Sequence, residues 1–200
     1  MNFEDWPPLL VVDVEGNGGN PPDLVEAAAL PIRGGKPDTS TAGAWTVRPP
    51  RPVTPFAAKV HGLTNELLAD RPVWQEVADQ ARTLLAGAWI CAHNAHVDYG
   101  VLKRHLPAWE PAGVIDTLRL ARATYKGLPS YSLDALTDYI GPDLTAAPGR
   151  RHRATYDAYA TAQLLIAMAG HYDTWGQLIA VGVPPNLPGA AEPETEQTLW

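Results

Sequence analysis

The sequence predicts an α/β fold in which a mixed central sheet is flanked by helices. Three strand-like segments joined by short turns come first, at residues 9–14, 24–32 and 43–47, and they are typical of an antiparallel meander. Strand and helix patterns then alternate along the chain, which indicates parallel strands with helices packed against them. Together the two halves predict three antiparallel strands followed by parallel ones.

The first half is defined by apolar runs and by the turns between them. The run LLVVDV at 9–14 is short, apolar and β-branched, which predicts a buried strand. The segments NGGNPP at 17–22 and GGKP at 34–37 have the composition of turns. Prolines at 49–55 end the strand pattern, and Thr64 is predicted to cap a short helix.

The second half is defined by apolar residues at helical spacing, separated by short strand-like runs. We expect helices at residues 73–86, 97–106, 117–125, 133–140 and 154–169, with strands at 89–93 and 114–115. Ser132 is the predicted cap of the fourth of these helices, and the fifth is the longest. This order places helices on the faces of the sheet.

The size of the chain fits one domain with a full core. It has 200 residues, of which 46% are hydrophobic and 18% charged, so most of the chain is expected to be globular. We predict a domain at residues 1–180. Residues 181–200 are rich in proline and acidic side chains, and we interpret them as a C-terminal tail.

Several function classes are disfavoured by composition. No apolar run approaches the ~20 residues that span a membrane, and the first residues lack the basic region of a secretory signal. Cys91 is the only cysteine, which excludes an internal disulfide and a cysteine-rich zinc site. A cytoplasmic location is therefore the default expectation. The net charge of −7 argues against tight non-specific duplex binding but allows a nuclease that grips a few nucleotides at one end.

Two acids lie at the end of the first predicted strand. Asp13 and Glu15 are two residues apart, so both side chains project from one face, while Val12 and Val14 project from the other. Neighbouring carboxylates repel each other, and a divalent cation between them removes that penalty. The alternative is a strand end with two solvated acids.

A third acid, Asp98, lies in the first turn of the helix that follows the strand at 89–93. This position is near the edge of the sheet where ligands bind in α/β folds. Asp98 could instead serve only to complement the positive end of its helix. Asn94 lies in the same strand-to-helix turn, and we favour a capping or scaffold role over substrate contact.

The last candidates are a histidine and an acid around the start of the longest helix. Asp157 lies one turn into that helix, and His152 lies on the loop before it. Histidine changes charge near neutral pH, so it suits removal of a proton from water. Alternatively, His152 is a surface residue in a basic cluster with its neighbouring arginines. Converging carboxylates favour Mg²⁺ or Mn²⁺, and the whole set indicates a two-metal phosphodiester hydrolase.

The order D-x-E, N-x-x-x-D, H-x-x-x-x-D resembles the DEDDh branch of the DnaQ-like 3′–5′ exonucleases, which have a ribonuclease H-like fold. HGLT at 61–64, AHNA at 92–95, DTLRLAR at 116–122 and YSLDAL at 131–136 are also similar to that family. The resemblance covers about residues 9–169. The sister branch has tyrosine where this chain has Arg153, which excludes the tyrosine type.

The resemblance implies a role for each acid. Asp13, Glu15 and Asp157 would hold one Mg²⁺ or Mn²⁺ ion, and Asp13 with Asp98 nearby would hold a second. His152 would be the general base. The residues implied in substrate binding are Val14, Gly16, His61 and Asn94.

One segment departs from the family pattern. Relatives usually carry Thr or Ser after D-x-E, whereas this chain has Gly16-Asn17-Gly18-Gly19-Asn20. Glycines remove side-chain bulk, so a roomier pocket for the terminal nucleotide is one hypothesis. A tight strand-to-strand turn is the other.

The predicted function is removal of nucleoside monophosphates from the 3′ ends of single-stranded DNA or RNA. The alternatives are an exoribonuclease of RNA processing, a proofreading subunit of a polymerase and a non-catalytic nucleic-acid-binding module. Retention of four acids and a histidine argues against the last, because unpaired buried charge is costly. The resemblance also implies a homodimer or a polymerase or repair partner. Arg119, Arg122 and Lys126 share a helix face and either steer phosphates or form a solvated basic face.

Overall fold

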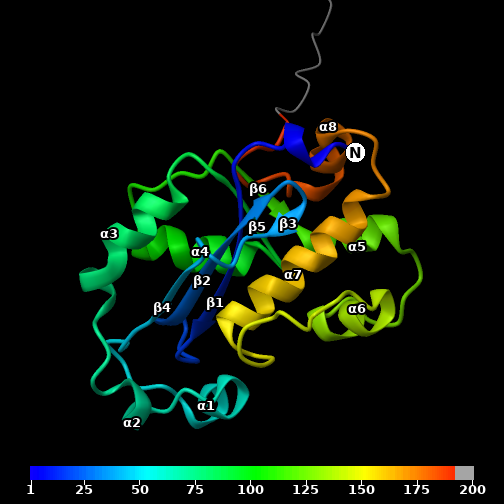
Figure 1. Ribbon diagram of the computed structural model, residues 1–200. Helices are drawn as coiled ribbons and strands as arrows, with labels where there is room; N and C mark the ends of the chain where they lie inside the picture. Colours follow the sequence, from blue (N-terminus) through cyan, green and yellow to red (C-terminus); the bar gives the residue numbers. More distant parts are fainter. Residues whose placement is uncertain (192–200) are drawn as a thin grey trace, which may run out of the picture.

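Six strands form one mixed sheet whose two faces are covered by helices (Figure 1). The structure, a computed structural model, describes residues 1–191. The strands are β1 (Leu9–Gly16), β2 (Leu24–Arg33), β3 (Lys36–Pro37), β4 (Gly43–Thr46), β5 (Trp89–Ala92) and β6 (Gly113–Asp116). The helices are η1 (Phe3–Asp5), α1 (Pro55–His61), α2 (Asn65–Leu68), α3 (Trp74–Leu85), α4 (His96–His105), α5 (Thr117–Thr124), α6 (Leu133–Ile140), α7 (Ala154–Ala169) and α8 (Trp175–Gly182).

The sheet has the predicted mixture of strand directions. β2 pairs with β1, β3 and β4 in the antiparallel sense, whereas β1 pairs with β5, and β5 with β6, in the parallel sense. The order along the sheet is β3-β2-β1-β5-β6, with β4 also on β2. The carboxyl ends of the three parallel strands therefore meet at one edge, which is where ligands bind in such sheets.

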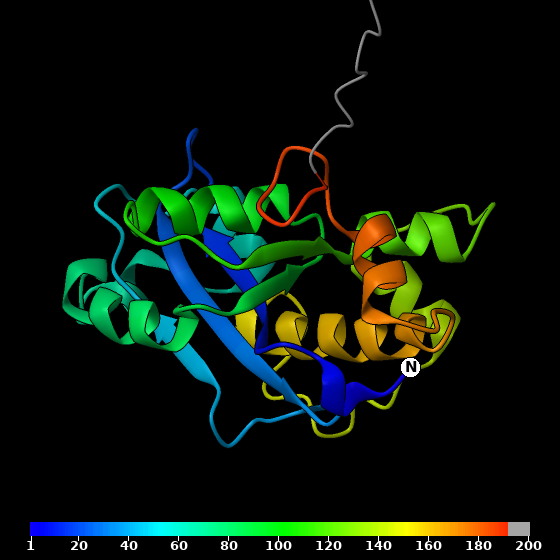
Figure 2. The same cartoon turned by 90° about the horizontal axis from the view of Figure 1, so that it is seen from above.

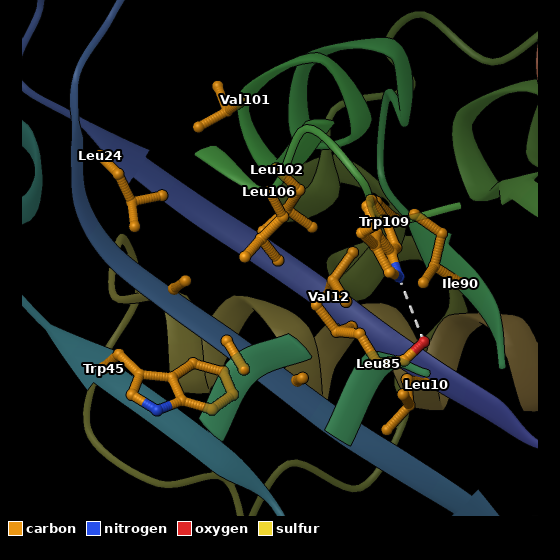
Figure 3. Close-up of a cluster of buried hydrophobic side chains, with 14 of the residues drawn as sticks. Leu10, Val12, Leu24, Trp45, Leu85, Ile90, Val101, Leu102, Leu106 and Trp109 are labelled. Carbon is orange, nitrogen blue, oxygen red and sulfur yellow. Dashed lines mark hydrogen bonds between the residues drawn. The ribbon is translucent and has the colours of Figure 1, made fainter. Parts of the chain in front are cut away.

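Alternation along β1 divides the core into two layers. Leu10 and Val12 face a layer built with α3 and α4, in which Trp109 Nε1 donates to the carbonyl of Leu85 at 3.2 Å (Figure 3). Leu9 and Val11 face the opposite layer, which contains α7 (Figure 2). The next two residues with the second orientation are Asp13 and Glu15, so the strand itself directs both acids to the α7 side.

Helix α7 packs closely on the sheet because its inner face is made of small residues. Ala154, Ala158 and Ala162 are fully buried, and α7 contacts both β1 and β2. The boundaries of α6 and α7 are those predicted, and the predicted caps Thr64 and Ser132 accept N–H groups from their own helices. The close contact allows a side chain in the first turn of α7 to reach the end of β1.

The end of the domain lies beyond the predicted residue 180. Helix α8 was not expected, and after it the chain folds back so that Val183 and Leu187 are buried. The carbonyl of Pro188 accepts the N–H of Val114 in β6 at 2.8 Å. Apolar side chains between prolines make residues 183–190, the return segment, part of the fold, so the prediction of a tail beginning at 181 is wrong for these residues. The rest of the predicted tail, residues 192–200, lies outside the described residues.

No helix in the described part of the chain is both long and apolar enough to cross a lipid bilayer.

Candidate active site

Three predicted acids converge where β1 ends. Asp13 and Glu15 come from β1, and Asp157 comes from the first turn of α7. One carboxylate oxygen from each residue can be chosen so that all three lie within 4.8 Å of one another. The structure thus brings together residues that are more than 140 positions apart in the sequence, as the motif order predicts.

The fourth acid reaches the same strand from the opposite layer. Asp98 is buried in the first turn of α4, and its Oδ1 accepts the backbone N–H of Val14 at 3.1 Å. Val14 lies between Asp13 and Glu15. Asp98 therefore does more than complement the helix N-terminus, because it ties α4 to the acid-bearing end of β1.

The pKa values of these acids are raised. Burial, followed by repulsion from Asp98, Glu15 and Asp157, raises the pKa of Asp13 well above its usual value. Burial is also the main cause that raises the pKa of Glu15 to about 7, of Asp98 to about 8 and of Asp157 to about 6. Carboxylates crowded in this way gain most from a nearby cation.

This donor set fits a hard divalent cation. All three converging groups offer carboxylate oxygens, which Mg²⁺ and Mn²⁺ prefer over nitrogen or sulfur ligands. The raised pKa values show that the folded protein leaves these negative charges undercompensated. Asp13, Glu15 and Asp157 are the residues best placed to hold an ion, with Asp98 next to them.

His152 lies beside Asp157 on the loop before α7. Its backbone is left-handed, with φ 61°, and its N–H donates to Oδ2 of Asp157 at 3.1 Å. His152 is exposed. Its closeness to Asp157 partly offsets the rise in the pKa of Asp157 that burial causes. The backbone of His152 is thus fixed to a carboxylate of the site while its ring stays accessible to solvent.

The sequence interpretation missed Glu26. This residue lies in β2 directly opposite Glu15, and only 4% of its side chain is exposed. Its carboxylate accepts from Arg153 Nε at 3.0 Å, from Arg153 Nη2 and from the N–H of Ala154 at 2.9 Å. Burial alone would raise the pKa of Glu26, but these hydrogen bonds outweigh it and leave the pKa below its usual value. The available signal was a lone acid inside the apolar run LVEAAAL.

Gly16 and His61 meet at the start of the glycine-rich turn. His61 is buried, and its Nδ1 accepts the N–H of Leu63 at 3.0 Å. Nε2 therefore carries the ring proton, and it donates to the carbonyl of Gly16 at 3.3 Å. A Cβ on Gly16 would lie 2.8 Å from Cβ of Pro22. Because Pro22 fills this space, the structure favours a tight turn over a roomier pocket at Gly16.

Asn94 does not have the predicted capping role. Among the described residues, its side chain accepts no N–H from the first turn of α4, whose N-cap is Ala95. Asn94 instead adopts a left-handed backbone with φ 67°, which asparagine tolerates better than most residues, and its N–H donates to Asp116 Oδ1 at 3.1 Å. Its exposed side chain lines a surface cavity of about 490 Å³ with Arg119 and Arg122.

The arrangement has counterparts among known proteins. Residues 10–165 match the family RNase_T, described as "Exonuclease". The chain is 39% identical over 131 residues to DNA polymerase III subunit epsilon of Pasteurella multocida, covering 62% of this chain and 51% of that protein. It is 35% identical over 159 residues to exodeoxyribonuclease 10 of Escherichia coli K12, covering 79% of this chain and 67% of that one.

Solved structures show the same fold. "Exonuclease X in complex with 5′ overhanging duplex DNA" superposes with a TM-score of 0.72 at 32% identity, over 86% of this chain and 97% of that one. Escherichia coli exonuclease I bound to a dT13 oligonucleotide superposes with a TM-score of 0.69 at 19% identity, over 82% of this chain and 41% of that one. The chain spans about half the length of the epsilon subunits that it matches.

Proposed function

Because this chain belongs to the exonuclease family that it matches over residues 10–165, we propose that it is a metal-dependent 3′–5′ exonuclease that releases nucleoside monophosphates. The observation that carries the proposal is the convergence of Asp13, Glu15 and Asp157. Asp98 lies next to them and accepts the N–H of Val14, the residue between Asp13 and Glu15. Such a set suits hydrolysis of a phosphodiester, in which charge develops on both sides of the phosphorus.

The proposed roles follow from position. Asp13, Glu15 and Asp157 would hold one Mg²⁺ or Mn²⁺ ion, and Asp13 with Asp98 would hold a second. When bound, the cations supply positive charge that stabilises the transition state and makes water more acidic. His152, anchored through its N–H to Asp157 and exposed at its ring, would accept the proton of the attacking water.

The proposed substrate is the 3′ end of single-stranded DNA. Two relatives carry names that refer to DNA, and the structure of exonuclease X is a complex with DNA. Val14, Gly16, His61 and Asn94 are proposed to border the terminal nucleotide, Gly16 and His61 through the fixed backbone of the turn. Cytoplasmic location, a homodimer and a polymerase or repair partner stay predictions.

The test is digestion of oligonucleotides labelled at the 5′ end. Single-stranded DNA and RNA of the same sequence are incubated with Mg²⁺ or Mn²⁺, with a chelator as control. We expect a ladder that shortens from the 3′ end, faster for DNA. Internal cuts, or no reaction with either metal, would contradict the proposal, and faster digestion of RNA would reassign the substrate.

A further inference from the structure

Glu26 forms a link between the sheet and the loop that carries His152. Its side chain comes from the β2 position opposite Glu15, and it is one of few charged side chains in the interior of the described residues. Both of its oxygens are used: Oε1 accepts from Arg153 Nη2 and from Thr46 Oγ1 at 3.1 Å, and Oε2 accepts from Arg153 Nε and the Ala154 N–H. A buried carboxylate with this many donors is held in one orientation.

Apart from Thr46, the groups that Glu26 binds immediately follow His152. Arg153 is the next residue, and Ala154 is the first residue of α7. The first N–H groups of a helix have no partner within the helix, so the carboxylate of Glu26 acts as the cap that the Arg153 side chain does not provide. This contact fixes where α7 begins.

The same contact fixes the backbone that directly follows His152. His152 holds a left-handed conformation, and its N–H reaches forward to Asp157, one turn into α7. Position 152 is thus held between the Arg153–Glu26 pair and the Asp157 carboxylate. A shift of Arg153 away from Glu26 would move the start of α7, the His152 backbone and Asp157 together.

We propose that Glu26 and Arg153 are positioning residues that align His152 and Asp157 with the acids of β1. The inference rests on the proposed exonuclease function, and neither residue is assigned a contact with substrate or metal. Misplacement of a reacting group by about 1 Å can cost about 10² in rate, so loss of the pair should affect the chemical step rather than binding of the nucleic acid.

The experiment compares Arg153→Gln and Glu26→Gln, alone and combined, with Arg151→Gln. Arg151 is a matched control because it lies on the same loop at the other side of His152 and pairs with Asp134 and Asp138 of α6, at 3.2 and 3.1 Å. Arg151→Gln and Arg153→Gln each remove one positive charge from the same loop, so a loss of kcat that is seen only in Arg153→Gln cannot be a general charge effect.

We expect Arg153→Gln and Glu26→Gln each to lower kcat by about 10- to 100-fold while KM for a single-stranded oligonucleotide changes less than about twofold. The kcat of the double variant should be no lower than that of the less active single variant, because both substitutions remove the same linkage. Arg153→Lys, which keeps the charge but not the forked contact, should recover part of kcat. Arg151→Gln should stay within about twofold of wild type.

A second readout does not depend on activity. Amide hydrogen exchange should accelerate at His152 and Ala154 in the Arg153→Gln and Glu26→Gln proteins but not in Arg151→Gln. Wild-type kcat in Arg153→Gln, equal losses in the two arginine variants, or lower thermal stability with unchanged kcat and exchange would overturn the proposal. An inactive wild-type protein would contradict the proposed function instead, and the exchange data would still test the linkage.

Discussion

The carboxylate of Asp98 accepts the backbone N–H of Val14, so the only residue between Asp13 and Glu15 is bonded to a third acid. The two layers on opposite faces of the sheet are joined at this point, since Asp98 comes from α4 and the other acids face α7. One side chain therefore combines a structural contact with a negative charge, and substitutions can separate the two.

Replacing Asp98 by Asn should separate the hydrogen bond from the charge. The Asn Oδ1 can still accept the N–H of Val14, and the raised pKa of Asp98, caused mainly by burial, shows that its charge is unfavourable in the metal-free fold. Without metal, we expect Asp98→Asn to keep or raise Tm, whereas Asp98→Ala should lose about 1–3 kcal/mol of stability. Both variants should lose about 10²–10³ in kcat. Thermal melts and initial rates give the two quantities. A fully active Asp98→Asn enzyme would contradict the role of the charge.

Asp13 should be essential for hydrolysis but not for folding. Burial and four neighbouring acids raise its pKa, so Asp13→Asn removes a repulsive charge from the metal-free protein. We expect a higher Tm than wild type without metal, a smaller Tm increase on addition of Mn²⁺, and no detectable digestion of DNA. Asp157→Asn should behave in the same way. Activity of Asp13→Asn equal to wild type would refute the assignment of the site.

His152 should affect the rate more than metal binding. Replacement by Ala removes the proposed base, and the expected fall in kcat is about 10²–10⁴. Since the backbone at 152 is left-handed, Ala also adds strain, and His152→Asn is the better matched variant. Calorimetric titration with Mn²⁺ should give nearly the wild-type affinity for both variants. An unchanged kcat in His152→Asn would exclude a role as base.

The stability of the metal-free protein should depend on pH around the site. Burial, the largest cause, raises the pKa of Glu15 to about 7 from 4.5 and of Asp157 to about 6 from 3.8. An acid with a raised pKa binds its proton more tightly when folded, so its contribution to stability is greatest below its ordinary pKa and declines as pH rises to the folded value. The gain in Tm on saturation with Mn²⁺ should therefore increase from about pH 5 to about pH 7.5. The same series with Asp157→Asn should show a weaker increase, and a gain independent of pH would contradict the picture.

The Gly16 position tests the tight turn against the roomier pocket. A Cβ there would overlap Cβ of Pro22, so Gly16→Ala should cost about 1–3 kcal/mol of stability. In a Pro22→Gly background the same substitution should cost much less, because the overlapping atom is gone. Denaturant unfolding of the four proteins measures the coupling. Equal costs in both backgrounds, together with a changed preference for the terminal nucleotide, would support the pocket hypothesis.

Local patterns predicted the parts of the fold that depend on neighbouring residues. The boundaries of α6 follow from its cap Ser132 and its apolar spacing, and those of α7 follow from its long run of apolar residues. Alternation along β1 correctly assigned the faces of Asp13 and Glu15. The convergence of Asp13, Glu15 and Asp157 followed from the order of three motifs rather than from any one of them.

The missed features depend on partners that are distant in sequence. Glu26 and Arg153 are separated by 127 positions, and nothing near either residue indicates the other. Asn94 was expected to have a capping or scaffold role. Among the described residues its side chain caps no helix, and tertiary packing sets its backbone to positive φ. The return segment after α8 has the prolines of a linker, yet Val183 and Leu187 give it enough apolar area to pack.

The return segment also affects how the molecule meets other molecules. β6 is the last strand on its side of the sheet, and an edge strand with free N–H groups is a template for pairing with another chain. The carbonyl of Pro188 accepts the N–H of Val114, and Pro184, Pro185 and Pro188 have no N–H groups with which to extend the ladder. Shortening the chain at residue 182 removes none of the acids proposed to hold metal but opens this edge, so the expected consequence is self-association rather than loss of hydrolysis.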